Sequence, residues 1–228
     1  GGLGAQETSV KPYTFLFDMD GTLLDSSAAV VDAVAAGLRR AYTHHGLPAA
    51  DPDYELINSC MGLPSEDYFE QAYPPASVPV SLRADFALTY GRFTAEEEVA
   101  AVDRGETRLY DGVAEALGEL RTRGHRLLLF SNAGRIYFDA IVRGHHLDGF
   151  FERTLSLGRA RDEGVARDKS GMVLALADDP ARTIVVGDRR GDIEAGRAAG
   201  ALTVGCLYGF GSPEELEAAD WKVDGPGG

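Results

Sequence analysis

Several acidic and hydroxyl side chains in this chain stand at the ends of short apolar segments. Asp18 and Asp20 flank Met19 directly after one such segment, so in an extended backbone their side chains point the same way. Later segments are followed by Ser131 and Asn132 and by Asp188 and Asp192, and Lys169 stands just before a predicted helix. Because open α/β sheets bind ligands at the carboxyl ends of their strands, we expect these side chains to converge on one cleft.

Four carboxylates in one cleft would repel one another unless a cation compensates them. Oxygen ligands without cysteine or histidine indicate a hard ion, and Mg²⁺ is the expected one. A carboxylate beside such an ion can attack an electrophilic phosphorus atom, and a second carboxyl group can protonate the leaving oxygen and then activate water. The residues themselves therefore predict a magnesium-dependent site for phosphoryl transfer.

The motifs that carry these residues resemble those of the haloacid dehalogenase-like superfamily. Residues 18–26, DMDGTLLDS, look like its first motif, and residues 128–132, LLFSN, are similar to its second. Lys169 stands where the lysine of the third motif is expected, although it lacks the Lys-Pro pairing common in relatives. Residues 185–196, VVGDRRGDIEAG, resemble the fourth motif. The resemblance covers nearly the whole chain, in the family's order and spacing.

The resemblance implies a role for each site residue. Asp18 would be the nucleophile that forms an aspartyl-phosphate, and Asp20 would be the general acid and base. The implied phosphate-binding residues are Ser131, Asn132 and Lys169. The implied metal ligands are Asp18, Asp188 and the carbonyl oxygen of Asp20. Asp192 and Thr22 are expected to hold these ligands in place without binding the metal directly.

The elements that must position these residues alternate along the chain. Continuous apolar strands are predicted at residues 14–17, 127–130, 183–186 and 201–204, which suits a parallel sheet covered on both faces. Helical spacing is predicted between them at residues 112–123, 137–146, 170–177 and 193–199. The alternation predicts an α/β fold with a doubly wound, Rossmann-like parallel sheet.

A helical insert interrupts this alternation after the first strand. Residues 27–40, 65–71 and 80–102 have helical patterns, and a loop of that length would be anomalous. The sequence therefore predicts an α-helical cap at residues 26–110, inserted into a discontinuous core of residues 1–25 and 111–228. Gly62, Leu63 and Pro64 form a candidate specificity loop, and the glutamates at residues 96–98 are expected on a solvated helix face.

Composition limits the partners and the compartment. The chain has 228 residues, of which 36 are acidic and 22 basic, and its formal net charge is −14. So acidic a chain repels polyphosphates and anionic lipids, and we expect neither nucleic acid nor a membrane as partner. Cys60 and Cys206 are expected to be lone buried thiols in a reducing cytoplasm. The oligomeric state is not predicted.

These observations favour a Mg²⁺-dependent phosphomonoesterase of a small phosphorylated metabolite, phosphoglycolate-like or a sugar phosphate. Asp20 argues against the dehalogenase branch of the family, because a halide leaves without a proton. Lysines occur only at positions 11, 169 and 222, so the insert lacks the Schiff-base lysine of the phosphonate hydrolases. Residues 208–216 are similar to the tail of phosphoglycolate phosphatase-type members. The alternatives are a phosphosugar mutase of the β-phosphoglucomutase kind and a non-catalytic module that binds a phosphate ligand.

Overall fold

A parallel, six-stranded sheet with the strand order β5-β4-β1-β6-β7-β8 forms the centre of the molecule. The computed structural model describes residues 11–48, 51–73 and 75–228. The strands of the sheet are β1 (Thr14–Phe17), β4 (Arg126–Ser131), β5 (Arg153–Ser156), β6 (Thr183–Gly187), β7 (Leu202–Cys206) and β8 (Trp221–Val223). The four predicted strands fall on β1, β4, β6 and β7, and the doubly wound α/β fold is confirmed.

The order of the strands places β1 at the switch point of the sheet. The chain adds β4 and β5 on one side of β1 and then β6, β7 and β8 on the other. Leu16 pairs with Leu128 on the first side and with Val185 on the second. The crevice beyond the carboxyl end of β1 is therefore the place where such a sheet binds its ligand.

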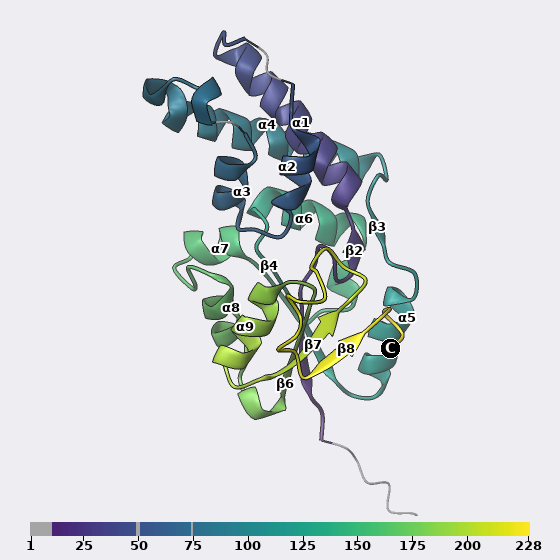
Figure 1. Ribbon diagram of the computed structural model, residues 1–228. Helices are drawn as coiled ribbons and strands as arrows, with labels where there is room; N and C mark the ends of the chain where they lie inside the picture. The colour runs from purple at the N-terminus through teal and green to yellow at the C-terminus, as the bar shows by residue number, and fades with distance from the viewer. Residues whose placement is uncertain (1–10, 49–50, 74) are drawn as a thin grey trace, which may run out of the picture.

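Helices cover both faces of the sheet, as the continuous apolar strands require. They are α5 (Val113–Thr122), α6 (Arg135–Gly144), α7 (Leu157–Asp162), α8 (Lys169–Leu176) and α9 (Arg190–Ala198). Leu16 belongs to a buried cluster with α8 and α9, whereas the next residue, Phe17, packs in the cluster that contains α5 and α6. Figure 1 shows α8 and α9 together on one side of the sheet and α5 on the other.

In the described residues between β1 and α5, four α-helices form a separate layer over the carboxyl end of the sheet (Figure 1). We call α1 (Ser27–His44), α2 (Tyr54–Ser59), α3 (Ser65–Gln71) and α4 (Arg83–Asp103) the cap helices. Helices α1 and α4 pack closely because Gly37 has no side chain, and a Cβ there would overlap Thr94. Buried aromatic rings hold α1 to α4: Tyr42 and Phe86 meet edge to face at 5.1 Å between centroids.

The cap helices join the sheet through two short antiparallel strands, β2 (Leu24–Asp25) and β3 (Arg108–Leu109). The predicted boundaries of the insert lie beside this pair. Helix α4 also packs against α6. The remaining elements are short 3₁₀ turns at Pro75–Ser77, Val80–Leu82, Leu147–Gly149 and Pro180–Arg182.

The sequence missed some elements and misplaced others. Strands β2, β3, β5 and β8 and helices α2 and α7 were not predicted. Helix α4 begins at Arg83 because residues 80–82 form a 3₁₀ turn. Cys60 and Cys206 are free and buried, as expected. Among the described residues, no helix combines the length and the apolar character that crossing a bilayer requires.

Candidate active site

A buried lysine donates hydrogen bonds to two of the predicted carboxylates near the end of β1. Lys169 is the first residue of α8, whose start is capped by Asp168 accepting a hydrogen bond from the amide of Gly171 at 2.8 Å. The Lys169 Nζ donates to Asp18 at 2.9 Å and to Asp192 at 2.6 Å. Burial alone would lower the pKa of Lys169, but the two carboxylates raise it above its usual value. The ammonium group is therefore fixed in its charged form beside Asp18.

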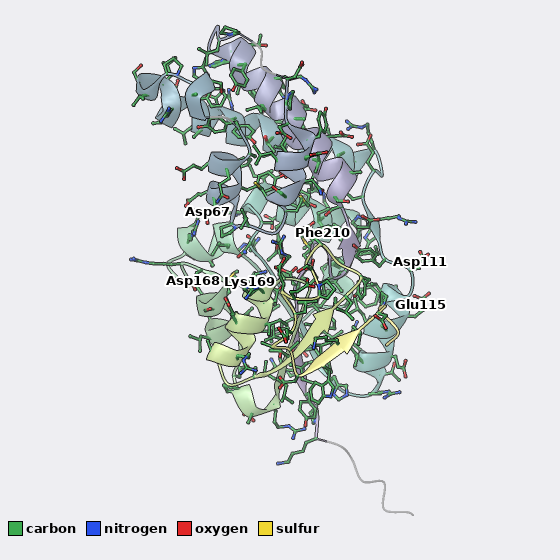
Figure 2. All side chains as sticks on the ribbon, viewed as in Figure 1. Asp67, Asp111, Glu115, Asp168, Lys169 and Phe210 are labelled. Carbon is green, nitrogen blue, oxygen red and sulfur yellow. The ribbon has the colours of Figure 1, made fainter. Side chains whose placement is uncertain are left out.

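Asp188 is held by the turn after β1 and by the loop after β7. The Thr22 hydroxyl donates to one of its oxygens at 3.2 Å, and the Phe210 amide donates to the other at 2.7 Å. Gly21 has a φ of +83°, and a Cβ there would overlap the Asp188 carboxylate. A Cβ at Gly209 would also overlap Asp188, as well as the carbonyl oxygen of Gly21. Lys169 and Phe210 both lie at the end of the sheet that faces the cap helices (Figure 2).

Asp20 is oriented by two hydroxyl groups from different elements. Ser26 donates to its Oδ1 at 2.6 Å, and Tyr137 of α6 donates to the same oxygen at 2.7 Å. Burial raises the pKa of Asp20 above its usual value, and the two hydrogen bonds lower it in part. A carboxyl group with a raised pKa suits proton transfer near neutral pH. The sequence analysis did not identify Tyr137 as a site residue.

Ser131 is the last residue of β4 and Asn132 follows it, and both line the same cavity as Asp18 and Asp20. The buried Ser131 Oγ accepts a hydrogen bond from the Ala133 amide at 3.0 Å. The Asn132 side chain donates to the carbonyl oxygen of Gly62 at 3.1 Å, so it contacts the loop between α2 and α3. Its assignment as a phosphate-binding residue stays a prediction.

The predicted specificity loop reaches the site only in part. Gly62 and Leu63 line the cavity, whereas Pro64 does not. Arg189 also lines it, forms an ion pair with Glu215 at 3.0 Å and donates to the carbonyl oxygen of Met61. The loop is therefore held from the core side by Asn132 and Arg189.

The buried carboxylates can accommodate a divalent metal ion. Asp18, Asp188 and Asp192 offer oxygen atoms that lie within 4.8 Å of one another. Lys169 contacts two of the three carboxylates, so the group carries more negative than positive charge. Burial and repulsion from Asp192 raise the pKa of Asp18, and the same two causes raise the pKa of Asp188 to about 6. A hard cation such as Mg²⁺ would offset this excess charge.

Asp192 is already engaged within this group. One of its oxygens accepts from Lys169, and the other accepts from the Arg189 amide at 3.0 Å. These contacts hold the Asp192 carboxylate in place within the group. The assignment of Asp18, Asp188 and the carbonyl oxygen of Asp20 as metal ligands, with Asp192 in support, stays a prediction.

A cavity of about 440 Å³ joins the acidic group to the cap helices. Its core side includes Asp18, Asp20, Ser131 and Lys169. Its cap side includes Glu98, which corrects the expectation that all three glutamates at 96–98 lie on a solvated face. Burial, followed by repulsion from Asp20, raises the pKa of Glu98 to about 8. Gly91, Ala95 and Glu98 all line the cavity, and their spacing places them on one helix face. This spacing is the feature of the sequence that could have separated Glu98 from Glu96 and Glu97.

Known proteins share this architecture. A family described as haloacid dehalogenase-like hydrolase matches residues 13–200. N-acetylmuramic acid 6-phosphate phosphatase of Pseudomonas aeruginosa is 30% identical over 225 residues, which cover 92% of this chain and 87% of that protein. Phosphoglycolate phosphatase of Colwellia psychrerythraea is 27% identical over 216 residues, which cover 92% of this chain and 91% of that protein.

A solved structure described as a predicted phosphoglycolate phosphatase from Haemophilus somnus has the same fold. It superposes with a TM-score of 0.73 at 22% identity, over 95% of this chain and 96% of that one. The family match extends from β1 to α9, which takes in four strands of the sheet and the cap helices, and it includes Asp18, Asp20, Lys169 and Asp188. The chain therefore belongs to the haloacid dehalogenase-like hydrolase family.

Proposed function

We propose that the protein is a Mg²⁺-dependent phosphomonoesterase that hydrolyses a small phosphorylated metabolite. One observation carries this proposal: a buried carboxylate next to a fixed lysine, Asp18, shares a cavity with a second carboxyl group, Asp20, that two hydroxyl groups orient. Nucleophilic attack and general acid catalysis need two such groups in different surroundings. The names of the relatives support phosphate esters as the class of substrate.

In the first step, an oxygen of Asp18 attacks phosphorus and the bond from phosphorus to the ester oxygen breaks. Asp20 gives its proton to the leaving alkoxide, so an alcohol departs and an aspartyl-phosphate remains. Asp20 then takes a proton from a water molecule, whose oxygen attacks phosphorus as the bond to Asp18 breaks. Inorganic phosphate is released, and both carboxyl groups return to their starting states.

The charges around the reacting phosphorus atom are supplied by several groups. Lys169 and Ser131 face the cavity and would contact the phosphoryl oxygens. Mg²⁺, held by Asp18, Asp188 and the carbonyl oxygen of Asp20, would neutralise the negative charge that the phosphoryl group brings. Thr22 and Phe210 keep Asp188 in place through the hydrogen bonds described above.

The proposal is tested with p-nitrophenyl phosphate and purified protein. We expect turnover that requires Mg²⁺ and stops when EDTA is added. Asp18→Asn keeps the shape of the side chain but removes the nucleophile, so turnover should fall to background. Glu97→Gln changes a carboxylate that pairs with Arg40 outside the site, and it should leave the rate unchanged. Circular dichroism must show that each variant is folded. Asp18→Asn turnover close to the normal rate, after removal of contaminating phosphatases, would reject this mechanism.

A mutase of the β-phosphoglucomutase kind would use the same side chains but return the phosphoryl group to the sugar. Incubation with a hexose 1-phosphate separates the two reactions. Release of inorganic phosphate supports the esterase, whereas accumulation of a hexose 6-phosphate without phosphate release would identify the mutase. Absence of both reactions with every phosphate ester would leave a binding protein on this fold.

A further inference from the structure

Glu98 differs from the two glutamates that precede it in α4. Glu96 and Glu97 form ion pairs with Arg40 at 2.5 and 2.8 Å on the outside of the cap helices. Glu98 instead lines the cavity that Asp20 and Tyr137 also line, and repulsion from Asp20 contributes to its raised pKa. Among the residues that the structure describes, it has no hydrogen-bonding or ion-pairing partner. Its carboxyl group is therefore a polar group of the cavity wall whose hydrogen-bonding capacity the protein does not use.

The surroundings of Glu98 in the cavity are apolar. The cap side of the wall is built from Val30, Val34, Tyr68, Phe69, Ala95 and the loop at residues 61–63. Over the described residues, no lysine, arginine or histidine of the cap helices lines the cavity. The cations that do line it stand on the core side, where Lys169 pairs with Asp18 and Asp192, Arg189 pairs with Glu215, and Arg135 lies near Asp139.

The apolar cap wall and the carboxyl group of Glu98 on it favour some alcohol parts of a bound ester over others. On the cap side, a carboxylate or a second phosphate on that part would be buried in an apolar wall whose described residues offer it no cation, next to the carboxyl groups of Glu98 and Asp20. An N–H or O–H group would find an acceptor oxygen of Glu98 among apolar side chains, where a hydrogen bond contributes to discrimination. An aliphatic or aromatic frame would pack against the valine and aromatic side chains.

We propose that Glu98 determines specificity by accepting a hydrogen bond from an amine or hydroxyl group on the alcohol part of the substrate. The inference rests on the proposed phosphatase function and narrows it: the substrates are phosphate monoesters of neutral or cationic alcohols with an apolar frame. Esters whose alcohol part carries a carboxylate, such as 2-phosphoglycolate, are selected against.

The test uses two series of phosphate esters that differ only in one remote group. The longer series is phenyl phosphate with a para aminomethyl, hydroxymethyl, ethyl or carboxymethyl group, whose leaving groups have similar basicity. The shorter series is 2-aminoethyl, 2-hydroxyethyl and ethyl phosphate together with 2-phosphoglycolate. Values of kcat/KM are measured with Mg²⁺ for both series. Two lengths are used because the varied group must be at the right distance from the phosphate to contact Glu98.

In at least one series, we expect the amine or hydroxyl ester to exceed the carboxylate ester at least tenfold in kcat/KM. Glu98→Gln should bring the ratio between the amine and carboxylate esters to within about threefold, and Glu98→Lys should invert it. Glu97→Gln is the matched control and should preserve the ratio. Equal or greater activity on the carboxylate ester in both series, or a ratio unchanged in both Glu98 variants, would overturn the proposal.

A binding measurement separates this inference from the proposed reaction. Benzylphosphonates with the same four para groups cannot be hydrolysed, and their dissociation constants are measured by calorimetry. If no ester is hydrolysed but the aminomethyl phosphonate binds best and loses its advantage in Glu98→Gln, the phosphatase function fails while the role of Glu98 holds. If the esters are hydrolysed and neither measurement depends on Glu98, the phosphatase function holds and the role of Glu98 is rejected.

Discussion

Tyr137 places its hydroxyl group on the oxygen of Asp20 that also accepts from Ser26. Two donors on Oδ1 leave Oδ2 as the oxygen that can exchange a proton with the leaving group and with water. The ring of Tyr137 is buried, so its hydroxyl group is fixed in position by packing of α6. We therefore regard Tyr137 as a positioning residue that acts through Asp20.

Tyr137→Phe should slow the hydrolysis of an alkyl phosphate by about tenfold, the worth of one hydrogen bond to a charged group. The loss should be smaller for p-nitrophenyl phosphate, because its leaving group needs less protonation. The hydrogen bond from Tyr137 lowers the pKa of Asp20, so its removal raises that pKa further. Asp20 must be protonated to act as an acid, and the alkaline limb of the pH–rate profile should move to higher pH.

Rates of both esters across pH 5 to 9 check this expectation, with Tyr208→Phe as a comparison because its hydroxyl group contacts the Thr22 carbonyl oxygen instead. Equal losses on the two esters with an unmoved alkaline limb would mean that Tyr137 has a structural role only.

At the residue scale, the sequence predicted the acidic and basic members of the site but not the groups around them. Asp18, Asp188 and Lys169 stand in motifs whose spacing is characteristic, and the structure brings them together. Tyr137 could not be distinguished from an ordinary core tyrosine, because its partner Asp20 lies 117 positions away. Glu98 was misassigned because three consecutive glutamates resemble a solvated face, and only the cap packing separates the third from the others.

Among the elements, the strands that the sequence predicted are those buried on both faces. Strands β1, β4, β6 and β7 carry continuous apolar runs, which is the pattern of an interior parallel strand. Two of the missed strands, β5 and β8, stand at the two edges of the six-stranded sheet. Their sequences, RTLS and WKV, have too few apolar residues to be recognised, and pairing with a neighbour decides their conformation. Trp221 of β8, on the edge of the sheet, is 53% exposed.

Two residues of the core, beside different elements, hold the loop of residues 61–63. Asn132 follows β4 and Arg189 precedes α9, and both donate to carbonyl oxygens of the loop. This loop lies between α2 and α3 and lines the cavity. Its position over the site should therefore depend on Asn132 if that residue acts through the loop, and phosphate affinity should depend on Asn132 if it binds phosphate directly.

Asn132→Ala distinguishes the two roles. If the loop contact dominates, KM for an ester with a large alcohol part should rise about fivefold, the worth of one hydrogen bond near 1 kcal/mol. The inhibition constant of inorganic phosphate should then stay within about twofold, because phosphate does not reach the cap. Ser131→Ala serves as the comparison, since Ser131 lies on the core side. A parallel rise of KM and the inhibition constant in Asn132→Ala would assign the residue to phosphate binding.

The whole molecule carries an excess of negative charge, and the active site also holds more carboxylates than cations. The formal net charge is −14, and three buried carboxylates gather around one lysine. Burying like charges weakens the folded state, and the raised pKa values of Asp18 and Asp188 express that cost. A divalent cation that binds only the folded protein should therefore stabilise the entire fold, because the carboxylates stand directly after β1, directly after β6 and in α9, and they meet only when the sheet is assembled.

Thermal unfolding should report this linkage directly. Mg²⁺ at about 100 times its dissociation constant adds about 2.7 kcal/mol to the free energy of unfolding, which corresponds to a rise in Tm of roughly 5–10 °C for a chain of this size. The measurement compares MgCl₂ with NaCl at the same ionic strength, because salt also screens the net charge. Asp188→Asn should reduce the Mg²⁺-dependent rise, since it removes one negative ligand while its neighbours remain. Glu97→Gln removes a charge from the surface and should keep the full rise. An equal rise with NaCl, or an undiminished rise in Asp188→Asn, would show that the stabilising ion does not occupy the carboxylate group.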